Sequence, residues 1–201
     1  NGLVDGLETV PDSFILNYPV SNLDSDALFS YLDLDSDGDA CPDVTEAGFT
    51  DTDNDNIIGT SPITVDQQGK VIGITDGYTI PDSDYSTSAP ILLNTPFNDV
   101  VFCEASTSTI TIDSTADTFQ WEISIDGGTN WTDIVNDTTY NGAKTSSLQI
   151  TNLQVPYNNY KYRVYLKRIG NACDKTSNEI TLIVNPLPIV SNASIDQCIV
   201  A

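Results

Sequence analysis

The sequence contains no histidine and no methionine, and only 7 of its 201 residues are lysine or arginine. Histidine is the most common general base near neutral pH and a frequent ligand of transition metals, and methionine is a soft metal ligand. These absences remove the usual residues of transition-metal sites and of acid–base catalysis. The shortage of basic residues argues against nucleic acid as a partner, because nucleic-acid binders carry a basic patch.

The sequence also lacks any run of roughly 20 apolar residues, the length that spans a membrane as a helix. No signal-peptide pattern is visible. The first eight residues read as the back half of a calcium loop, with Asp5 and Glu8 as ligands and the front half missing. We therefore expect the chain to be a piece of a longer protein whose export signal lies outside it.

Acidic residues are abundant and unevenly distributed. The net charge is −22, and residues 1–100 contain 19 acidic and 1 basic side chains, against 10 and 6 in residues 101–201. This asymmetry predicts an ion-binding half followed by an ordinary globular half, with a polar, proline-bearing transition near residue 90. The expected parts are an acidic domain, a β domain, and a linker with the start of a following module: residues 1–90, 91–186 and 187–201.

Aspartates fall on every second residue in two clusters. Their members are Asp33, Asp35, Asp37 and Asp39, and then Asp51, Asp53 and Asp55. Two unit charges about 4 Å apart repel by roughly 1 kcal/mol in water and by roughly 4 kcal/mol at an effective dielectric constant of about 20. A cation at the centre offsets this repulsion, and Ca²⁺ takes about 6–8 oxygen ligands. A solvated acidic loop is the alternative, but the alternation and the repetition favour Ca²⁺.

The first cluster fits the twelve-position calcium loop, whose ligands occupy positions 1, 3, 5, 7, 9 and 12, with a backbone carbonyl at position 7. With Asp35 at position 1, the ligands are Asp35, Asp37, Asp39, Cys41, Asp43 and Glu46. Position 6, usually glycine, is then Ala40. A second register starts at Asp33 and puts Gly38 at position 6, but it puts Val44 at position 12. We prefer the first register and expect Asp33 to serve a neighbouring ion.

The second cluster fills only the front of such a loop. Its positions 1, 3, 5 and 7 are Asp51, Asp53, Asp55 and Ile57. Positions 9 and 12 carry no carboxylate, so we expect the missing ligands to come from Asp82 and Asp84. Upstream, Asp24 and Asp26 are expected to reach the first cluster. The apolar residues that follow are expected to pack beneath the ions: Leu28, Phe29, Tyr31, Leu32 and Leu34.

The second half shows the alternation of half-buried strands. The predicted strands are residues 109–113, 119–125, 147–153, 160–167 and 179–184. Asp126-Gly-Gly128 is a strong hairpin-turn signal. Several short strands at this spacing predict a mainly β fold with a two-sheet sandwich.

Both halves resemble known families. Residues 35–46 resemble a thrombospondin type 3 calcium repeat, and residues 99–185 resemble an immunoglobulin-like module. Trp121 stands where such a module buries its central tryptophan, and Leu148-x-Ile150-x-x-Leu153 followed by Tyr162 resembles the approach to its tyrosine corner. The resemblance implies an irregular calcium-loop domain followed by an immunoglobulin-like β-sandwich.

Four cysteines are present: Cys41, Cys103, Cys173 and Cys198. Disulfides and millimolar calcium sites both belong to extracellular settings. In the resemblance to an immunoglobulin-like module, Val164 stands where a core cysteine is usual, so the usual inter-sheet disulfide is absent. We expect Cys103 and Cys173, the remaining pair of that module, to form a disulfide. Cys198 is expected to open a following module, and Cys41 to be free or to have a partner outside the chain.

Three segments together resemble the large repetitive surface proteins of Bacteroidetes that are exported by type IX secretion, including the SprB-type gliding adhesins. They are Tyr31–Asp37, Cys41–Gly48 and Ser124–Trp131. The resemblance implies a calcium-rigidified structural segment of an outer-membrane-attached adhesin that supports adhesion or gliding motility. The implied partners are neighbouring modules of the same chain and surface polysaccharide or other cell-surface proteins.

Two other functions are open from the sequence. The chain could be an accessory region of a secreted polysaccharide-degrading enzyme, with Trp131 exposed to bind carbohydrate; packing beside the Asp126 turn is the other interpretation of Trp131. Catalysis by paired carboxylates is known in glycoside hydrolysis, but these carboxylates are spaced as ion ligands, so we expect no enzymatic activity. Lys161, Arg163 and Lys167 share one strand face, which suits either an acidic neighbour or solvent.

Overall fold

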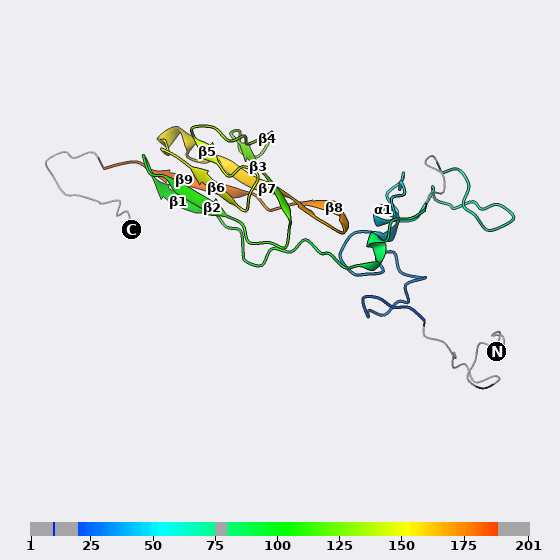
Figure 1. Ribbon diagram of the computed structural model, residues 1–201. Coiled ribbons are helices and arrows are strands. Elements are labelled where there is room, and N and C mark those ends of the chain that lie inside the picture. Colours follow the sequence, from blue (N-terminus) through cyan, green and yellow to red (C-terminus); the bar gives the residue numbers. More distant parts are fainter. Residues whose placement is uncertain (1–9, 11–19, 75–79, 189–201) are drawn as a thin grey trace. The chain divides into compact units, whose positions relative to one another are not determined.

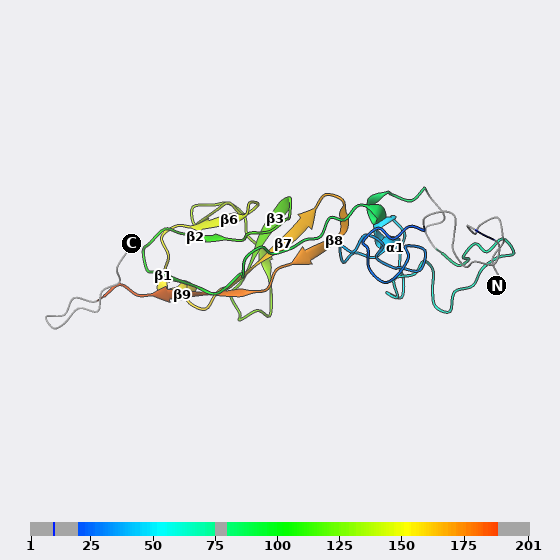
Figure 2. The same cartoon turned by 90° about the horizontal axis from the view of Figure 1, so that it is seen from below.

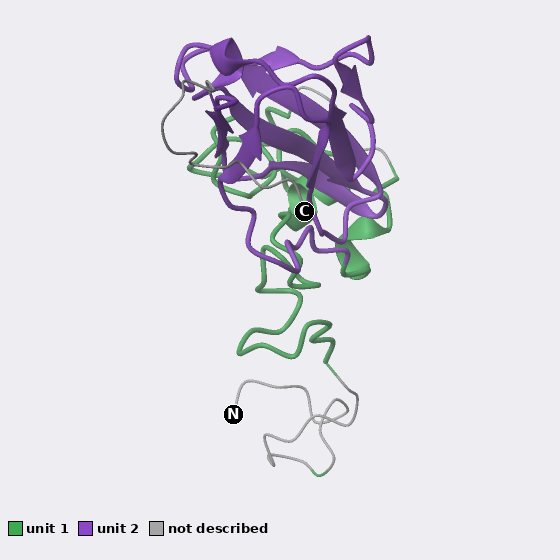
Figure 3. Cartoon of the chain, turned by 90° about the vertical axis from the view of Figure 1, so that its left-hand side faces the viewer, with its two compact units in different colours: residues 1–88 green, residues 89–201 purple. Residues whose placement is uncertain are grey.

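The computed structural model describes residue 10, residues 20–74 and residues 80–188. The chain divides into two compact units, residues 1–88 and residues 89–201 (Figure 3). The predicted ligands Asp5 and Glu8, and the cysteine Cys198, lie outside the described residues.

The described residues of the second unit, 89–188, form nine strands and one short helix (Figure 1). The strands are β1 (Val100–Cys103), β2 (Ser108–Thr111), β3 (Thr118–Ser124), β4 (Thr132–Asp133), β5 (Tyr140–Asn141), β6 (Ser147–Ile150), β7 (Lys161–Arg168), β8 (Asn171–Thr176) and β9 (Ile180–Asn185). The 3-10 helix η3 (Val155–Tyr157) precedes β7. The five strands predicted from alternation correspond to β2, β3, β6, β7 and β9, whereas the two-residue strands β4 and β5 are too short to show a period.

The strands form two sheets. One has the order β1-β9-β7-β3-β4, with β8 also paired to β7, and the other has the order β2-β6-β5. All pairings are antiparallel except that of β1 with β9. Strands β9, β7 and β3 opposite β2, β6 and β5 reproduce the G, F, C and B, E, D strands of an immunoglobulin-like sandwich. The predicted mainly β sandwich is therefore confirmed for this unit.

The core of the sandwich lies between the inward faces of the two sheets. Trp121 is fully buried, contacts Phe97 edge to face at a centroid distance of 5.9 Å, and faces Val164 across the β3–β7 pair. The predicted tyrosine corner differs in detail, because the Tyr162 hydroxyl lies 3.1 Å from that of Tyr140. Other core residues with no exposed surface include Leu148, Ile150, Leu153, Leu166 and Leu182.

The first unit has little regular structure among its described residues. It contains the single-turn helix α1 (Asp43–Glu46) and the 3-10 helix η2 (Asp84–Ser86). An antiparallel bridge between Val65 and Val71 marks a short hairpin. In the part of the chain that the structure describes, no helix has the length and apolar character needed to cross a membrane.

The expectation that residues 28–34 pack beneath the ions is wrong. These side chains are largely exposed: Leu28, Phe29, Tyr31, Leu32 and Leu34. Phe29 and Tyr31 stack on each other at 6.2 Å instead of entering a core. The physical reason is that the acidic loops occupy the interior of this unit, so the apolar side chains are left at its surface.

The described cysteines are all oxidised. Cys41, Cys103 and Cys173 are each disulfide-bonded, and the described part of the chain has no free cysteine. The sulfur of Cys41 lies in a fully buried side chain. The expectation of a free Cys41 is therefore wrong.

The strand register also contradicts the expected bond between Cys103 and Cys173. Cys103 pairs with Asn185, four residues along β9 from the residue that faces Lys161. Cys173 lies in β8 near Arg168, at the other end of β7. Seven residues of β7 and four of β9 separate these ends, roughly 35 Å at about 3.3 Å per residue. A disulfide needs Cα atoms about 4.4–6.8 Å apart.

Candidate metal centre

Three groups of aspartates in the first unit bring carboxylate oxygens together. Within each group, one oxygen per residue lies within 4.8 Å of the others. The groups are Asp24, Asp26 and Asp33; Asp35, Asp37 and Asp39; and Asp51, Asp53 and Asp55. All three sets were predicted as metal ligands. Asp33, which we expected to serve a neighbouring ion, lies with Asp24 and Asp26.

Backbone amides hold the first residue of the middle group. Asp35 Oδ1 accepts a hydrogen bond from the Asp39 amide at 3.2 Å, and Asp35 Oδ2 accepts one from the Ala40 amide at 3.0 Å. Asp39 Oδ1 accepts a further bond from the Cys41 amide at 2.9 Å. These short-range bonds curl the chain around its own carboxylates, so that loop positions 1, 3 and 5 face one point.

The curl requires left-handed backbone at two positions. Gly38 has a φ of 71° and Ala40 a φ of 73°. Glycine adopts this conformation without steric cost, whereas a residue with a Cβ is disfavoured there by roughly 1–2 kcal/mol. Ala40 therefore adopts the conformation that a glycine usually provides at position 6, which supports the register that begins at Asp35.

The helix α1 supplies the back of this loop. Its first residue, Asp43, donates its amide to the Leu34 carbonyl at 2.9 Å, which closes the loop. The Asp43 carboxylate accepts hydrogen bonds from the amide and hydroxyl of Ser36, at 2.7 and 2.6 Å. Its last residue, Glu46, is only 2% exposed. A single helical turn thus places Glu46 at loop position 12.

Two carboxylates of this loop are buried without a donor. Asp37 is 5% exposed and Glu46 is 2% exposed. Neither oxygen of either group has a hydrogen-bond partner among the described residues. A buried, unpaired carboxylate is costly because it has lost its hydration without compensation. Four carboxylate oxygens of this loop are therefore buried without a hydrogen-bond donor. Asp37 belongs to the group with Asp35 and Asp39, whereas Glu46 belongs to none of the three groups found among the described residues.

The electrostatics of the loop agree with this geometry. Burial, and after it the negative charges of the neighbouring aspartates, Asp39 first, raise the pKa of Glu46 to about 8. Burial, followed by the charge of Asp39, raises the pKa of Asp37 to about 6. Both shifts arise from burial and from the repulsion between carboxylates. A bound cation would lower both pKa values, because it favours the charged form of each group.

The second loop repeats the local structure of the first. Asp51 accepts hydrogen bonds from the amides of Asp55 and Asn56 at 3.3 and 2.7 Å, and Asp55 accepts one from Ile57 at 3.0 Å. Asn54 and Asn56 have φ values of 57° and 65°, at the positions that Gly38 and Ala40 occupy in the first loop. The hydrogen bonds and the backbone thus recur at identical spacing.

The back half of the second loop is closed differently from the prediction. Asp82 and Asp84 belong to none of the three groups found among the described residues. Asp82 instead donates its amide to the Ala47 carbonyl at 3.2 Å, just after α1. Ser61 lies beside this loop: its amide donates to Asp53 at 2.7 Å, and its hydroxyl donates to Asp55.

Sequence reasoning missed the two serines that position the carboxylates, Ser36 and Ser61. Ser36 is 2% exposed and fixes Asp43. Its place between two alternating aspartates was a usable signal. Ser61 lies six residues beyond Asp55, the end of the aspartate cluster, and no spacing rule of the twelve-position loop points to it.

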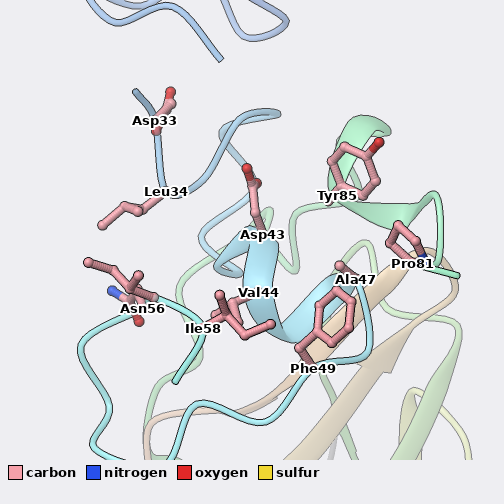
Figure 4. Close-up of a pocket in the computed structure, with 11 residues that line it drawn as sticks. Asp33, Leu34, Asp43, Val44, Ala47, Phe49, Asn56, Ile58, Pro81 and Tyr85 are labelled. Carbon is pink, nitrogen blue, oxygen red and sulfur yellow. The ribbon is translucent and has the colours of Figure 1, made fainter. Parts of the chain in front are cut away.

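Both loops border one apolar hollow of about 490 Å³. Figure 4 shows Leu34 and Val44 from the first loop and Ile58 from the second around it, with Phe49 and Tyr85 on the opposite side. The apolar lining joins the segments that carry the two groups of carboxylates. Ordering of one loop is therefore expected to favour ordering of the other.

Comparison with known proteins concerns the second unit. Residues 94–186 match a family described as "Domain of unknown function (DUF8696)". No curated protein matches the chain.

Solved immunoglobulin-domain structures resemble part of the chain. The N-terminal four immunoglobulin domains of Dscam1 isoform 4.44 match with 16% identity and a TM-score of 0.41, over 48% of this chain and 25% of that one. The N-terminal Ig1-2 module of the Drosophila receptor protein tyrosine phosphatase DLAR matches with 18% identity and a TM-score of 0.37, over 47% and 45%. This chain thus spans a quarter of the first and under half of the second. The strand order described above carries the assignment of the sandwich.

Proposed function

We propose that the first unit binds Ca²⁺ and that the chain is a calcium-rigidified structural segment of a cell-surface protein. The observation that carries the proposal is the pair of buried carboxylates, Asp37 and Glu46, whose oxygens have no donor among the described residues. The side-chain ligands of this site are Asp35, Asp37, Asp39, Asp43 and Glu46. The carbonyl of Cys41 completes it.

The donor set favours Ca²⁺ over other cations. All side-chain donors are oxygens, and the chain contains no histidine. Transition metals prefer nitrogen and sulfur ligands. Mg²⁺ keeps several waters and is rarely held by a dedicated cage of protein oxygens, whereas Ca²⁺ takes about 6–8 oxygens in flexible geometry. A carboxylate at five of the six proposed ligand positions of the first loop suits the larger ion.

The repeat of the loop supports a second ion. Asp51, Asp53 and Asp55 meet within 4.8 Å, and their backbone hydrogen bonds follow the pattern of the first loop. The carbonyl of Ile57 occupies position 7. In this site one carboxylate oxygen of Asp53 and one of Asp55 already accept hydrogen bonds from Ser61. We therefore expect the second loop to bind Ca²⁺ more weakly than the first loop.

Three features support the proposal of a structural role at the cell surface. The first unit has almost no regular structure among its described residues, so ions would supply much of its rigidity. The second unit is a complete sandwich. The oxidised cysteines suit an oxidising, extracellular setting. We propose that this segment belongs to an adhesin attached to the outer membrane and exported by type IX secretion, as the sequence resemblance implies, and that it supports adhesion or gliding motility.

The partners that fit this role are neighbouring modules of the same long chain, with surface polysaccharide or other cell-surface proteins as adhesion targets. The carbohydrate-binding alternative receives no support from Trp131. The Arg163 guanidinium covers its ring at 4.2 Å and is itself held by Glu122 at 2.6 Å. Two other basic side chains of β7 also have acidic partners: Lys161 pairs with Glu179 and Lys167 with Asp174.

Hydrogen exchange of the whole chain, with Ca²⁺ and with chelator, tests the proposal. Removal of Ca²⁺ should raise exchange rates in residues 33–61 and leave the buried amides of β3 and β7 unchanged. The sandwich therefore serves as the internal control. Equal exchange in residues 33–61 under both conditions would contradict a calcium-rigidified unit.

A further inference from the structure

The first and last strands of the sandwich run side by side in the same direction (Figure 2). The parallel register of β1 and β9 joins Val100 to Leu182 at one end and Cys103 to Asn185 at the other. In the same sheet, β9 pairs with β7 and β7 pairs with β3, and both of these pairs are antiparallel. The parallel pair is therefore the place where the beginning and the end of the sandwich are tied together.

Side-chain and loop hydrogen bonds extend this pairing beyond both strand ends. Before β1, Asp99 Oδ1 accepts from the Thr181 amide at 2.6 Å, and the Phe97 carbonyl accepts from Asn178 Nδ2 at 2.7 Å. After β1, the Glu104 amide donates to the Asn185 carbonyl at 2.8 Å. The Glu104 carboxylate accepts from the Leu187 amide at 3.0 Å. We call the whole contact, residues 97–104 against residues 178–187, the terminal seam.

The chain enters the sandwich at the end opposite to the one where β9 leaves it. Three side chains near the β7–β8 turn donate to consecutive carbonyls of the entering segment. They are Asn171 to Ala89 at 3.2 Å, Arg168 to Pro90 at 2.6 Å and Lys175 to Ile91 at 2.8 Å. Asn185 lies roughly 35 Å from this end, by the count of strand residues given above.

This arrangement determines how tension acts on the module. When the two chain ends are pulled apart, β1 is drawn toward the β7–β8 end and β9 toward the opposite end. Parallel strands pulled in this way slide along each other, so all hydrogen bonds between them are stretched together. In a hairpin pulled at its open end, the same bonds break one at a time.

We propose that the second unit is a tension-bearing module in which the terminal seam, loaded in shear, sets the mechanical strength. The entering segment is anchored by Arg168, Asn171 and Lys175, so the force reaches β1 along the strand axis. The inference concerns this unit alone and is independent of calcium binding by the first unit. Its failure and the failure of the calcium proposal are therefore separate results.

Single-molecule stretching of the whole 201-residue chain tests this proposal, with handles at both termini and reductant present so that disulfides carry no load. Unfolding of the sandwich should appear as one event that releases roughly 300 Å, because about 90 residues extend by about 3.3–3.6 Å each. Asp99→Ala removes the hydrogen bond of the seam in which the Thr181 amide donates to the charged Asp99 carboxylate. It should raise the unfolding rate under constant load by roughly tenfold.

The matched control is Asp126→Ala. Asp126 accepts hydrogen bonds from Ser124, Thr129 and Asn130 in the β3–β4 turn, and none of these three partners belongs to the terminal seam. It should lower stability in denaturant at least as much as Asp99→Ala, yet leave the unfolding rate under load unchanged. The proposal is contradicted if the two variants change that rate in proportion to their loss of stability in denaturant. It is also contradicted if the reduced protein gives no event near 300 Å.

Discussion

Ala40 and Asn56 occupy the same position in two loops of the first unit. Each has a positive φ, 73° and 65°, and each donates its amide to the first aspartate of its own loop, Asp35 or Asp51. The distances are 3.0 and 2.7 Å. Asparagine tolerates left-handed backbone better than alanine, so the first loop carries strain at this position that the second largely avoids.

Ala40→Gly should therefore stabilise the first unit. The left-handed conformation costs alanine roughly 1–2 kcal/mol, which exceeds the roughly 0.5–1 kcal/mol lost through the greater freedom of glycine in the unfolded chain. The expected net gain is about 0.5–1 kcal/mol, read from amide exchange of residues 33–46 in chelator. Ala47, with a φ of −70°, is the control: Ala47→Gly should destabilise by about 1 kcal/mol. A loss with Ala40→Gly would contradict the assigned backbone.

Glu46→Gln should have opposite effects with and without Ca²⁺. In chelator it removes a buried charge that has no partner among the described residues, so the first unit should become more stable. With Ca²⁺ it removes a ligand that can bind through both oxygens, so the affinity should fall at least tenfold. Amide exchange of residues 33–61 under both conditions checks this reversal of sign. The same sign of change in both conditions would show that Glu46 is not a ligand.

The metal-free protein should lose stability as the pH rises from about 5 to about 8. The pKa values of Asp37 and Glu46 are raised, to about 6 and about 8, from the ordinary values of 3.8 and 4.5. Between these limits the folded state binds more protons than the unfolded state, so its stability is greatest at low pH and falls as each group ionises. Asp126, with its pKa lowered to about 2 by hydrogen bonds, acts only below this window.

Amide exchange of the first unit, measured on chelator-stripped protein at pH 5 and pH 8.5 and corrected for the intrinsic exchange rate, checks this prediction. Both tryptophans, Trp121 and Trp131, belong to the second unit, so tryptophan fluorescence provides the control and should change little. Glu46→Gln should remove the upper part of the pH dependence. Stability of the first unit that is constant or rises over this range would contradict the raised pKa values.

Arg163→Ala should lower the stability of the sandwich by about 1–2 kcal/mol, since it removes both the stacking on Trp131 and the ion pair with Glu122. Denaturant unfolding followed by tryptophan fluorescence measures the loss. Trp131→Ala should behave alike and should not alter retention on columns of surface polysaccharide. If Trp131→Ala loses polysaccharide binding while the sandwich stays folded, the result would support carbohydrate binding by Trp131 and contradict the prediction.

Local pattern was sufficient for the parts of the fold that short-range physics determines. Strict alternation located β3 and β7, since one face of each packs in the core. The Asp-x-Asp-x-Asp spacing located the first loop, because its hydrogen bonds join residues two to five positions apart.

Contacts between residues far apart in the chain could not be predicted from the sequence. Cys103 and Cys173 lie at opposite ends of the sheet, so the expected bond between them was wrong. Their positions depend on the register of β1, β8 and β9, which a single sequence does not specify. The exposure of Tyr31 and its neighbours was also missed, because hydrophobicity alone does not say whether a core is available. Asp82 was assigned by type and distance along the chain, and it contacts Ala47 through its backbone instead.

The most direct test of the central claim is a calorimetric titration, in which Ca²⁺ is added to the whole chain after bound metal has been removed. We expect at least two ions per chain, with the tighter site lost in a variant that combines Asp37→Asn and Glu46→Gln and the weaker site lost in Asp51→Asn combined with Asp53→Asn. Asp133→Asn, an exposed aspartate of β4, should bind as the unmodified chain does. Saturation should also stabilise the first unit, by about 2.7 kcal/mol at 100 times the dissociation constant. No heat of binding at millimolar Ca²⁺, with protection of residues 33–61 unchanged, would contradict the account.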